Sequence, residues 1–281
     1  MRPAIDLVRS ELEELAGVLV DRRTPVEPFG SYVLRSGEPA AELGRHVERT
    51  VFLETFGDTR ELLDREYERY EPASVFFVVI DHRRRVPAGM MRIIVPSPAG
   101  FKSLEDLPRV WRAPAEEVLA GVERSWDLGR LWDFATLAVA PEYRGEAALG
   151  LITQALVQTL TMVGRRWGAR RFVAILDLPV LRMLQWRMGR PFEWFPDLEP
   201  RPYLGSPASA AVWGDVASWD VRLERADPIL HDVFFAGRGL EAIVSTPDWD
   251  DAAAIVDDAA PRRQSGTDDA GAVSRRTVAG S

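Results

Sequence analysis

The segment from Leu131 to Leu156 carries the residues best suited to chemistry. A β-like apolar run ends at Pro141, a short turn containing Arg144 and Gly145 follows, and a helix is expected to open near Ala147–Gly150. Small residues at a helix start let a phosphate approach free backbone N–H groups, and the helix dipole attracts the anion. Arg144 can add a direct charge contact. The spacing therefore predicts a pyrophosphate site, although many α/β proteins use such a turn merely to pack a helix on a sheet.

Several other chemistries are disfavoured by composition. The chain has 281 residues and no cysteine, so disulfides, thiolate metal sites and a cysteine nucleophile are excluded. The three histidines, His46, His82 and His231, show no metal-ligand spacing, and we expect no metal. Neither a Gly-x-Ser-x-Gly elbow nor a phosphate-binding Gly-Lys-Ser/Thr loop occurs. A net charge of −8 argues against a broad nucleic-acid-binding surface.

Hydrophobic periodicity indicates the elements that position this segment. Two β-like runs flank a charged turn and predict an antiparallel hairpin, 74–80 with 88–95. Strands are expected over 131–139, 171–176 and, by alternation, 211–223; helices are expected over 1–20, 40–56, 59–70, 115–124, 150–167 and 178–188. This order favours an α/β fold with one mixed sheet flanked by helices.

The chain divides into four parts by composition. Residues 1–30 read as an N-terminal helix and linker, 31–225 as the main domain, 226–247 as a helical extension and 248–281 as a disordered tail, because the last part has few large apolar residues. The N-terminus lacks the pattern of a secretory signal, and no run approaches the ~20 apolar residues of a membrane span. Together with the absence of cysteine, this favours a cytoplasmic protein.

The run Leu-Ala-Val-x-Pro-x-Tyr-Arg-Gly over residues 137–145, followed by Gly150 and a helix, resembles the acyl-CoA-binding signature of the GNAT superfamily of N-acyltransferases. The resemblance implies a GNAT-like fold in which the strand before the turn is splayed from its neighbour, so that its backbone pairs with the pantetheine arm. It assigns pantetheine to the backbone of 137–139 and the phosphates to the turn and the helix start. In full, the implied thioester-binding residues are Leu137, Ala138, Val139, Arg144, Gly145, Ala147 and Gly150.

The turn departs from the usual pattern Arg-Gly-x-Gly-x-Gly or Ala. Here the glycines Gly145 and Gly150 are one residue further apart, the middle glycine is replaced by alanine, and Glu146 brings negative charge toward the phosphates. The donor implied by the resemblance is therefore an acyl thioester of either CoA or an acyl carrier protein.

A more specific resemblance extends over roughly residues 45–222. The run Trp-Asp-Phe-Ala-Thr-Leu-Ala-Val over 132–139 is similar to Trp-Glu-Leu-Ser-Arg-Phe-Ala-Val of acyl-homoserine-lactone synthases and related long-chain N-acyl amino acid synthases. The segments 49–52 and 88–96 also resemble that branch. By these matches Arg49, Phe52, Arg92 and Trp132 would bind substrate. Thr136 stands where the branch has an arginine, and its acidic pair is only loosely matched by Asp64 and Glu68, so a relative acylating another amine fits better than a homoserine-lactone synthase.

Two residues are candidates for proton transfer in amine acylation, which requires a neutral amine and a group that takes its proton. Asp133 matches the acidic position of the branch strand and is the candidate base; the alternative is a structural carboxylate satisfied by Arg130. The helix predicted over 178–188 lacks the tyrosine that many GNAT enzymes use as an acid. Either the thiolate leaves without a side-chain acid, or Tyr203 or Tyr143 serves from elsewhere; Tyr203 is the candidate acid. Arg49 and Arg92 could equally pair with nearby carboxylates, and core packing is the ordinary role of Trp132 and Tyr143.

The function expected from these features is transfer of an acyl group from a CoA or carrier-protein thioester to the amine of a small molecule or amino acid. The alternative is a GNAT-fold module that binds a thioester or another ligand without turnover, favoured by the altered glycine spacing and the missing tyrosine. A third is a protein regulated through its acidic tail.

Overall fold

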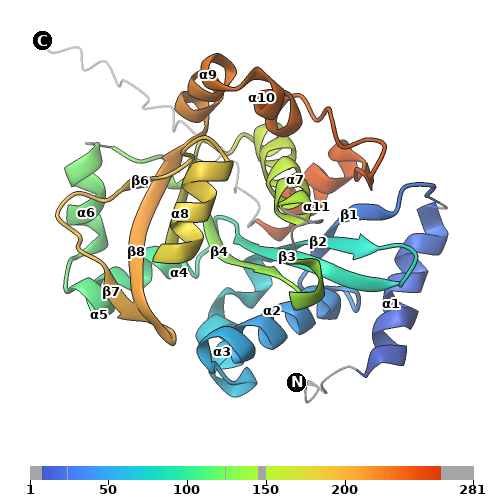
Figure 1. Ribbon diagram of the computed structural model, residues 1–281. Helices are drawn as coiled ribbons and strands as arrows, with labels where there is room; N and C mark the ends of the chain where they lie inside the picture. The colour runs from blue at the N-terminus through green and yellow to red at the C-terminus, as the bar shows by residue number, and fades with distance from the viewer. Residues whose placement is uncertain (1–7, 24, 124, 145–149, 261–281) are drawn as a thin grey trace, which may run out of the picture.

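The computed structural model describes residues 8–23, 25–123, 125–144 and 150–260. Its centre is a nine-stranded mixed sheet in the order β6-β8-β5-β4-β3-β2-β1-β9, with β7 pairing to β8 (Figure 1). The strands are β1 Phe29–Arg35, β2 Ser74–Asp81, β3 Val86–Ile94, β4 Leu131–Val139, β5 Arg171–Asp177, β6 Glu193–Trp194, β7 Arg201–Tyr203, β8 Ser206–Asp215 and β9 Val244–Ser245. The predicted α/β class with a mixed sheet is confirmed.

Helices cover both faces of this sheet. They are α1 Arg9–Arg23, α2 Ala41–Phe56, α3 Arg60–Tyr67, α4 Lys102–Glu105, α5 Leu107–Trp111, α6 Ala115–Val122, α7 Leu151–Trp167, α8 Leu178–Arg187, α9 Val216–Ala226, α10 Pro228–Phe235 and α11 Trp249–Ala259. Short 3-10 turns lie at Glu68–Ala73, Leu128–Arg130 and Pro141–Tyr143. Among the described helices, none is long and apolar enough to cross a membrane.

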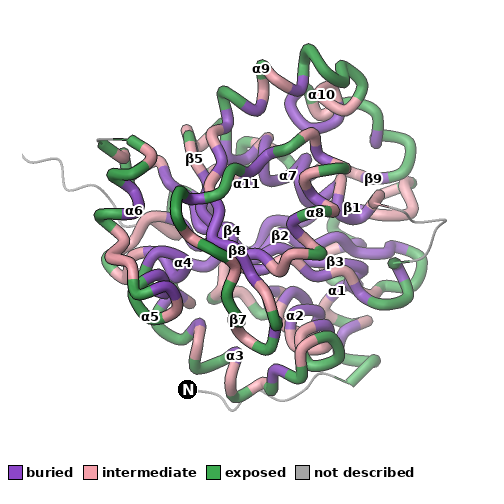
Figure 2. Tube along the Cα trace, turned by 60° about the vertical axis from the view of Figure 1, so that its left-hand side comes forward, coloured by how far each residue is buried: buried purple, intermediate pink, exposed green. Residues whose placement is uncertain are grey.

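Strand β2 shows why the sheet is covered on both sides. All eight of its residues are buried, and its side chains alternate between two apolar clusters. Phe76 and Val78 face α1 and α2, whereas Phe77 and Val79 face the side of α7. A continuous apolar run of this kind is stable where both faces are packed. Figure 2 shows these central strands as buried chain between the partly exposed helices.

The hairpin of β2 and β3 is antiparallel, as predicted, and β3 also pairs with β4 on its other side. Strand β3 pairs antiparallel with β4 from Ile94–Asp133 to Gly89–Val139. An extra residue, Ala135, interrupts this register between Phe134 and Thr136, which is the geometry of a β-bulge. The bulge lies close to the point where β4 parts from β5.

Two predicted elements differ in the structure. Strand β8 ends at Asp215, whose side chain accepts a hydrogen bond from the Ser218 N–H and caps α9, so the strand predicted over 211–223 is wrong after Asp215. The tail predicted from 248 is also wrong over Trp249–Ala259. There Asp248 caps α11, and Ala252 and Val256 are buried in the main core beside α7. Small apolar residues four apart suffice to dock this acidic helix.

The remaining predicted boundaries are close to the observed ones. The first helix runs over Arg9–Arg23 rather than 1–20, and residues 1–7 and 261–281 lie outside the described part. The C-terminal extension includes α10, and its strand β9 pairs parallel with β1 and completes the sheet edge.

Candidate active site

Strands β4 and β5 pair over three residues and then separate. Their parallel register runs from Leu131–Arg171 to Asp133–Val173, whereas β4 continues to Val139 and β5 to Asp177. In the antiparallel pairing with β3, alternate residues of β4 direct their N–H and C=O groups away from β3. These groups face the gap beyond Asp133 and can pair with an extended ligand.

A cavity of about 380 Å³ lies at this gap. It is bounded by the end of β4, the last turns of α2, the start of α7 and one face of α8. Its lining is mostly apolar and comprises Val51, Phe52, Thr55, Phe56, Leu137, Ala138, Val139, Tyr143, Arg144, Gly150, Ile152, Thr153, Val180, Met183 and Arg187. Six residues singled out from the sequence, Phe52, Leu137, Ala138, Val139, Arg144 and Gly150, are thus brought together here.

The N-terminus of α7 forms one end of the cavity. Gly150 precedes the helix with φ +86°, a left-handed conformation that favours glycine. A Cβ built on Gly150 would lie 3.2 Å from a guanidinium nitrogen of Arg187. The predicted residues Gly145 and Ala147 lie outside the described part of the chain.

Two arginines flank this helix start. The Arg144 Nε donates to the Val139 carbonyl at 2.7 Å, and Arg187 reaches the same end from α8. Arg187 was not predicted from the sequence. The sequence feature that could have identified Arg187 is the spacing of Val180, Met183 and Arg187, which places all three on one helix face. Two cations at a helix N-terminus suit a phosphate group.

Tyr143 forms part of the wall and has a packing role. Its hydroxyl donates to Asp81 Oδ2 at 2.9 Å and accepts from Arg84 at 3.2 Å, and its ring meets Phe29 edge to face. Burial and the neighbouring Asp81 carboxylate raise the pKa of Tyr143 to about 12. This side chain therefore stays protonated near neutral pH.

Asp133 is fully buried and does not line the cavity. Its Oδ2 accepts from the Ser103 N–H at 2.7 Å and its Oδ1 from the Ser103 hydroxyl at 2.6 Å. Burial raises the pKa of Asp133 to about 6, against the lowering effect of these hydrogen bonds. The partner of this carboxylate is Ser103 on α4 rather than the expected Arg130, which lies 3.6 Å from Asp127.

Tyr203 also lies away from the cavity lining. Its hydroxyl donates to Asp106 Oδ2 at 2.6 Å and accepts from Lys102 Nζ at 3.0 Å. Burial raises the pKa of Tyr203 well above its usual value. A phenol held in this way is a poor acid near neutral pH, and its hydrogen bonds fix α4 against β7.

The arginines expected to bind a substrate carboxylate are engaged in ion pairs. Arg92 is buried, donates to both oxygens of Glu48 at 2.6 and 3.0 Å, and donates to Glu71 at 2.6 Å. Arg49 donates to Glu42 at 3.3 Å and to Asp64 at 2.8 Å. Both arginines therefore pair with nearby carboxylates, which is the alternative role that the sequence analysis gave them.

Trp132 is a core residue. It is fully buried and packs against the rings of Phe77, Trp167 and Phe172, at centroid distances of 5.7 to 6.4 Å. Its indole lies on the α7 side of β4, where Gly164 leaves room for the ring. The structure therefore gives Trp132 the ordinary packing role.

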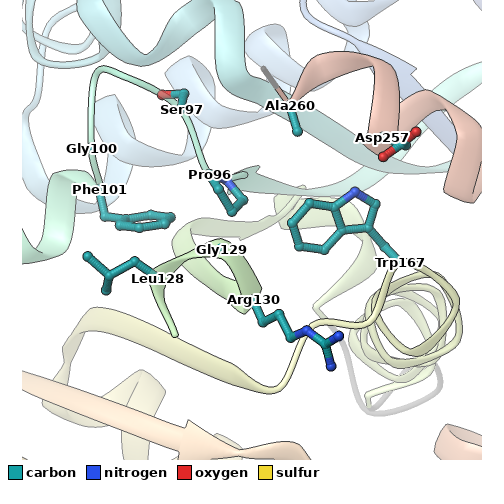
Figure 3. A pocket seen from close by; sticks show the side chains of 10 residues that line it. All are labelled: Pro96, Ser97, Gly100, Phe101, Leu128, Gly129, Arg130, Trp167, Asp257 and Ala260. Carbon is teal, nitrogen blue, oxygen red and sulfur yellow. The ribbon is translucent and has the colours of Figure 1, made fainter. Parts of the chain in front are cut away.

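A second cavity, of about 770 Å³, lies at the opposite end of β4 (Figure 3). Phe101 and Leu128 form one side of it, and Trp167 and Asp257 lie on the other. None of the thioester-binding or catalytic residues predicted from the sequence lines this cavity. Within the described residues, no group of three or more His, Cys, Asp or Glu side chains could hold a metal ion.

Comparison with known proteins finds similarity at the level of structure. No family model and no curated protein matches the chain. The structure of FeeM, an N-acyl amino acid synthase from uncultured soil microbes, is 15% identical and covers 72% of this chain and 98% of its own, with a TM-score of 0.53.

Two further solved structures give lower scores. TofI in a ternary complex with an inhibitor and MTA is 18% identical and covers 72% and 99% of the two chains, with a TM-score of 0.47. The CoA-dependent acyl-homoserine lactone synthase BjaI, with SAM and isopentyl-CoA, is 15% identical and covers 81% and 98%, with a TM-score of 0.46. The FeeM comparison establishes the architecture: this chain has the GNAT-like α/β fold expected from its sequence.

Proposed function

We propose that this protein is an N-acyltransferase that moves an acyl group from a CoA or carrier-protein thioester to the amine of a small molecule or amino acid. The observation that carries the proposal is the cavity at the separated ends of β4 and β5. It combines open strand edges, an apolar wall and the N-terminus of α7, and it gathers six residues that the sequence assigned to thioester or substrate binding.

Each part of the cavity suits one part of a thioester. The backbone groups within Leu137–Val139 that face the gap would pair with the amide groups of the pantetheine arm. The apolar side chains of Phe52, Val180 and Met183 would surround acyl carbons, since burying apolar surface is favourable. Arg144, Arg187 and the α7 N-terminus would hold the phosphate.

The reaction requires the participation of few side chains. The neutral amine attacks the thioester carbonyl carbon, the C–N bond forms and the C–S bond breaks, and the nitrogen's proton ends on the departing sulfur. Backbone N–H groups of β4 that face the gap are suitable donors to the developing oxyanion. The described cavity lining contains no carboxylate or imidazole, so a water or a group behind the wall takes the proton that makes the amine neutral.

A second candidate is a module that binds an acyl thioester without turnover. One observation favours it: Asp133 and Tyr203, the two side chains expected to transfer protons, are held by Ser103, Lys102 and Asp106 outside the cavity lining. This candidate shares the thioester site with the first and lacks the acceptor reaction.

The test is thermal melting of the full-length protein with acyl-CoAs from acetyl to palmitoyl, followed by thiol release in the presence of an amine panel. A ligand at ~100 times its dissociation constant stabilises by about 2.7 kcal/mol. We expect a rise in melting temperature that grows with acyl length, and amine-dependent release of CoA. A rise in melting temperature without amine-dependent release would favour the binding module. Absence of any shift, with holo carrier-protein thioesters included, would contradict both candidates.

A further inference from the structure

Asp58 is a buried carboxylate that neither the sequence analysis nor the reaction described above uses. It follows α2, whose C-terminal cap is Gly57, and its side chain is 3% exposed. No hydrogen-bond donor among the described residues reaches its Oδ2 atom. A buried carboxylate oxygen without a hydrogen-bond donor is costly.

The surroundings add to that cost. Asp58 lies at the C-terminal end of α2, where the helix dipole repels a negative charge. Burial, together with the nearby Glu66 carboxylate, raises the pKa of Asp58. Glu66 already accepts a hydrogen bond from Lys102 at 2.7 Å. The surroundings therefore favour a cation beside Asp58. No ion pair with a described residue provides that cation.

Asp58 is directly attached to the wall of the thioester cavity. Its N–H donates to the carbonyl of Phe52 at 3.3 Å, and both Phe52 and Phe56 line that cavity. The β7–β8 turn closes over it from the other side: a Cβ built on Gly205 would lie 2.6 Å from the Phe56 carbonyl and 3.0 Å from Asp58 Oδ1. Asp58 thus lies behind the part of the cavity wall formed by Phe52 and Phe56, between the end of α2 and the β7–β8 turn.

We propose that Asp58 binds the ammonium group of the acceptor, and that the acceptor is a primary alkylamine without an α-carboxylate. This inference rests on the proposed function. Asp58 takes one proton from the ammonium and leaves a neutral amine, which attacks the thioester carbon. The second nitrogen proton ends on the sulfur of the departing thiol, and Asp58 returns its own proton to solvent.

The absence of an α-carboxylate follows from the charges. Arg92 and Arg49, the arginines expected to bind such a group, are paired with Glu48, Glu71, Glu42 and Asp64. Arg144 and Arg187 stand at the α7 end of the cavity, where the thioester phosphate is expected. An amino acid would bring its carboxylate close to Asp58 and Glu66, which repel it.

The experiment compares tyramine with tyrosine, which share a side chain and differ in the carboxylate. Melting temperatures are measured for the full-length wild type, Asp58→Asn and the control Glu61→Gln, which removes an exposed carboxylate from α3. Each protein is tested alone, with a non-reactive thioether analogue of octanoyl-CoA, and with the analogue plus either amine.

We expect tyramine to raise the melting temperature of the wild type and of Glu61→Gln, and tyrosine to have a much smaller effect. Asp58→Asn should weaken tyramine binding about 10-fold or more, because a hydrogen bond between charged groups is lost. It should keep the shift with the thioether analogue. It should also melt no lower than the wild type, since it removes an unpaired buried charge.

Three results would overturn the inference: equal shifts with the two amines, no shift with either, or a tyramine shift that survives in Asp58→Asn. A melting temperature of Asp58→Asn well below that of the wild type would assign Asp58 a structural role and also overturn it. Failure of the wild type to bind the thioether analogue would instead count against the proposed function, whereas the tyramine shifts measured in the presence of the analogue would still test Asp58.

Discussion

Asp133 accepts two hydrogen bonds from a single residue, Ser103, one from its backbone N–H and one from its hydroxyl. This hydrogen-bonded pair joins the last residue of β4 that pairs with β5 to the start of α4. A carboxylate in this position ties down the point where the two strands begin to separate. We infer that Asp133 shapes the opening of the cavity through the position of β4.

The buried carboxyl of Asp133 should make stability depend on pH. Its pKa is raised to about 6 in the folded protein, so the folded state binds its proton more tightly than the unfolded chain does. The contribution of Asp133 to the free energy of unfolding therefore falls as pH rises from about 4 to about 6, by on the order of 2–3 kcal/mol, and stays low above that range. Urea unfolding of the wild type and Asp133→Asn at several pH values isolates this difference. Parallel curves for the two proteins would contradict the prediction.

The two arginines at the start of α7 should control donor affinity. Replacing Arg144 or Arg187 with Ala is expected to weaken acyl-CoA binding about 10-fold each, since each removes a charged hydrogen bond to a phosphate. Titration calorimetry at low and moderate salt measures this loss, which should shrink as salt increases. Arg182→Ala is the matched control, because Arg182 is exposed on α8, the helix that carries Arg187, and does not line the cavity. An equal loss in the control would point to general charge attraction instead.

The sequence predicts the central strands and the start of α7 because both depend on local signals. Apolar runs such as Ser74–Asp81 mark buried strands, and Gly57 and Gly168 mark the ends of α2 and α7 through their left-handed conformation. The turn before α7 is recognisable because its residue types are adjacent in the chain. Helix α11 was missed because its docking requires only a few small residues among many acidic ones.

The roles of single polar residues depend on contacts that are distant in sequence. Asp133 and Ser103 are 30 residues apart, Arg92 and Glu48 are 44 apart, and Tyr203 and Asp106 are 97 apart. Motif similarity places such residues in the right region of the fold. It does not tell whether a carboxylate meets a substrate or a serine, because that depends on which distant side chain packs against it.

The apolar wall of the cavity should set the acyl length. Val180 lines it from α8, and Val180→Trp is expected to reduce the free volume. The variant should then lose most of the melting-temperature shift with palmitoyl-CoA and keep that with acetyl-CoA. Thermal melting with the same acyl-CoA series tests this. Val221→Trp, a substitution of a half-exposed valine on α9, controls for the added tryptophan, and equal losses in both variants would contradict the assignment.

The ion pair of Arg92 and Glu48 gives the sharpest test of whether Arg92 is structural. Both side chains are almost wholly buried, and Glu48 also accepts from the Thr136 hydroxyl at 2.6 Å. Arg92→Met leaves Glu48 without its cation and should lower the free energy of unfolding by about 3–5 kcal/mol. Adding Glu48→Gln removes the stranded charge, so the double variant should regain part of that loss. Urea unfolding of the three proteins measures these changes. A different result would assign Arg92 to the substrate site: a stable Arg92→Met protein that still binds acyl-CoA and has lost only acceptor binding. Removing a side chain whose role is to hold substrate should not lower the free energy of unfolding, whereas removing the cation of a buried ion pair should.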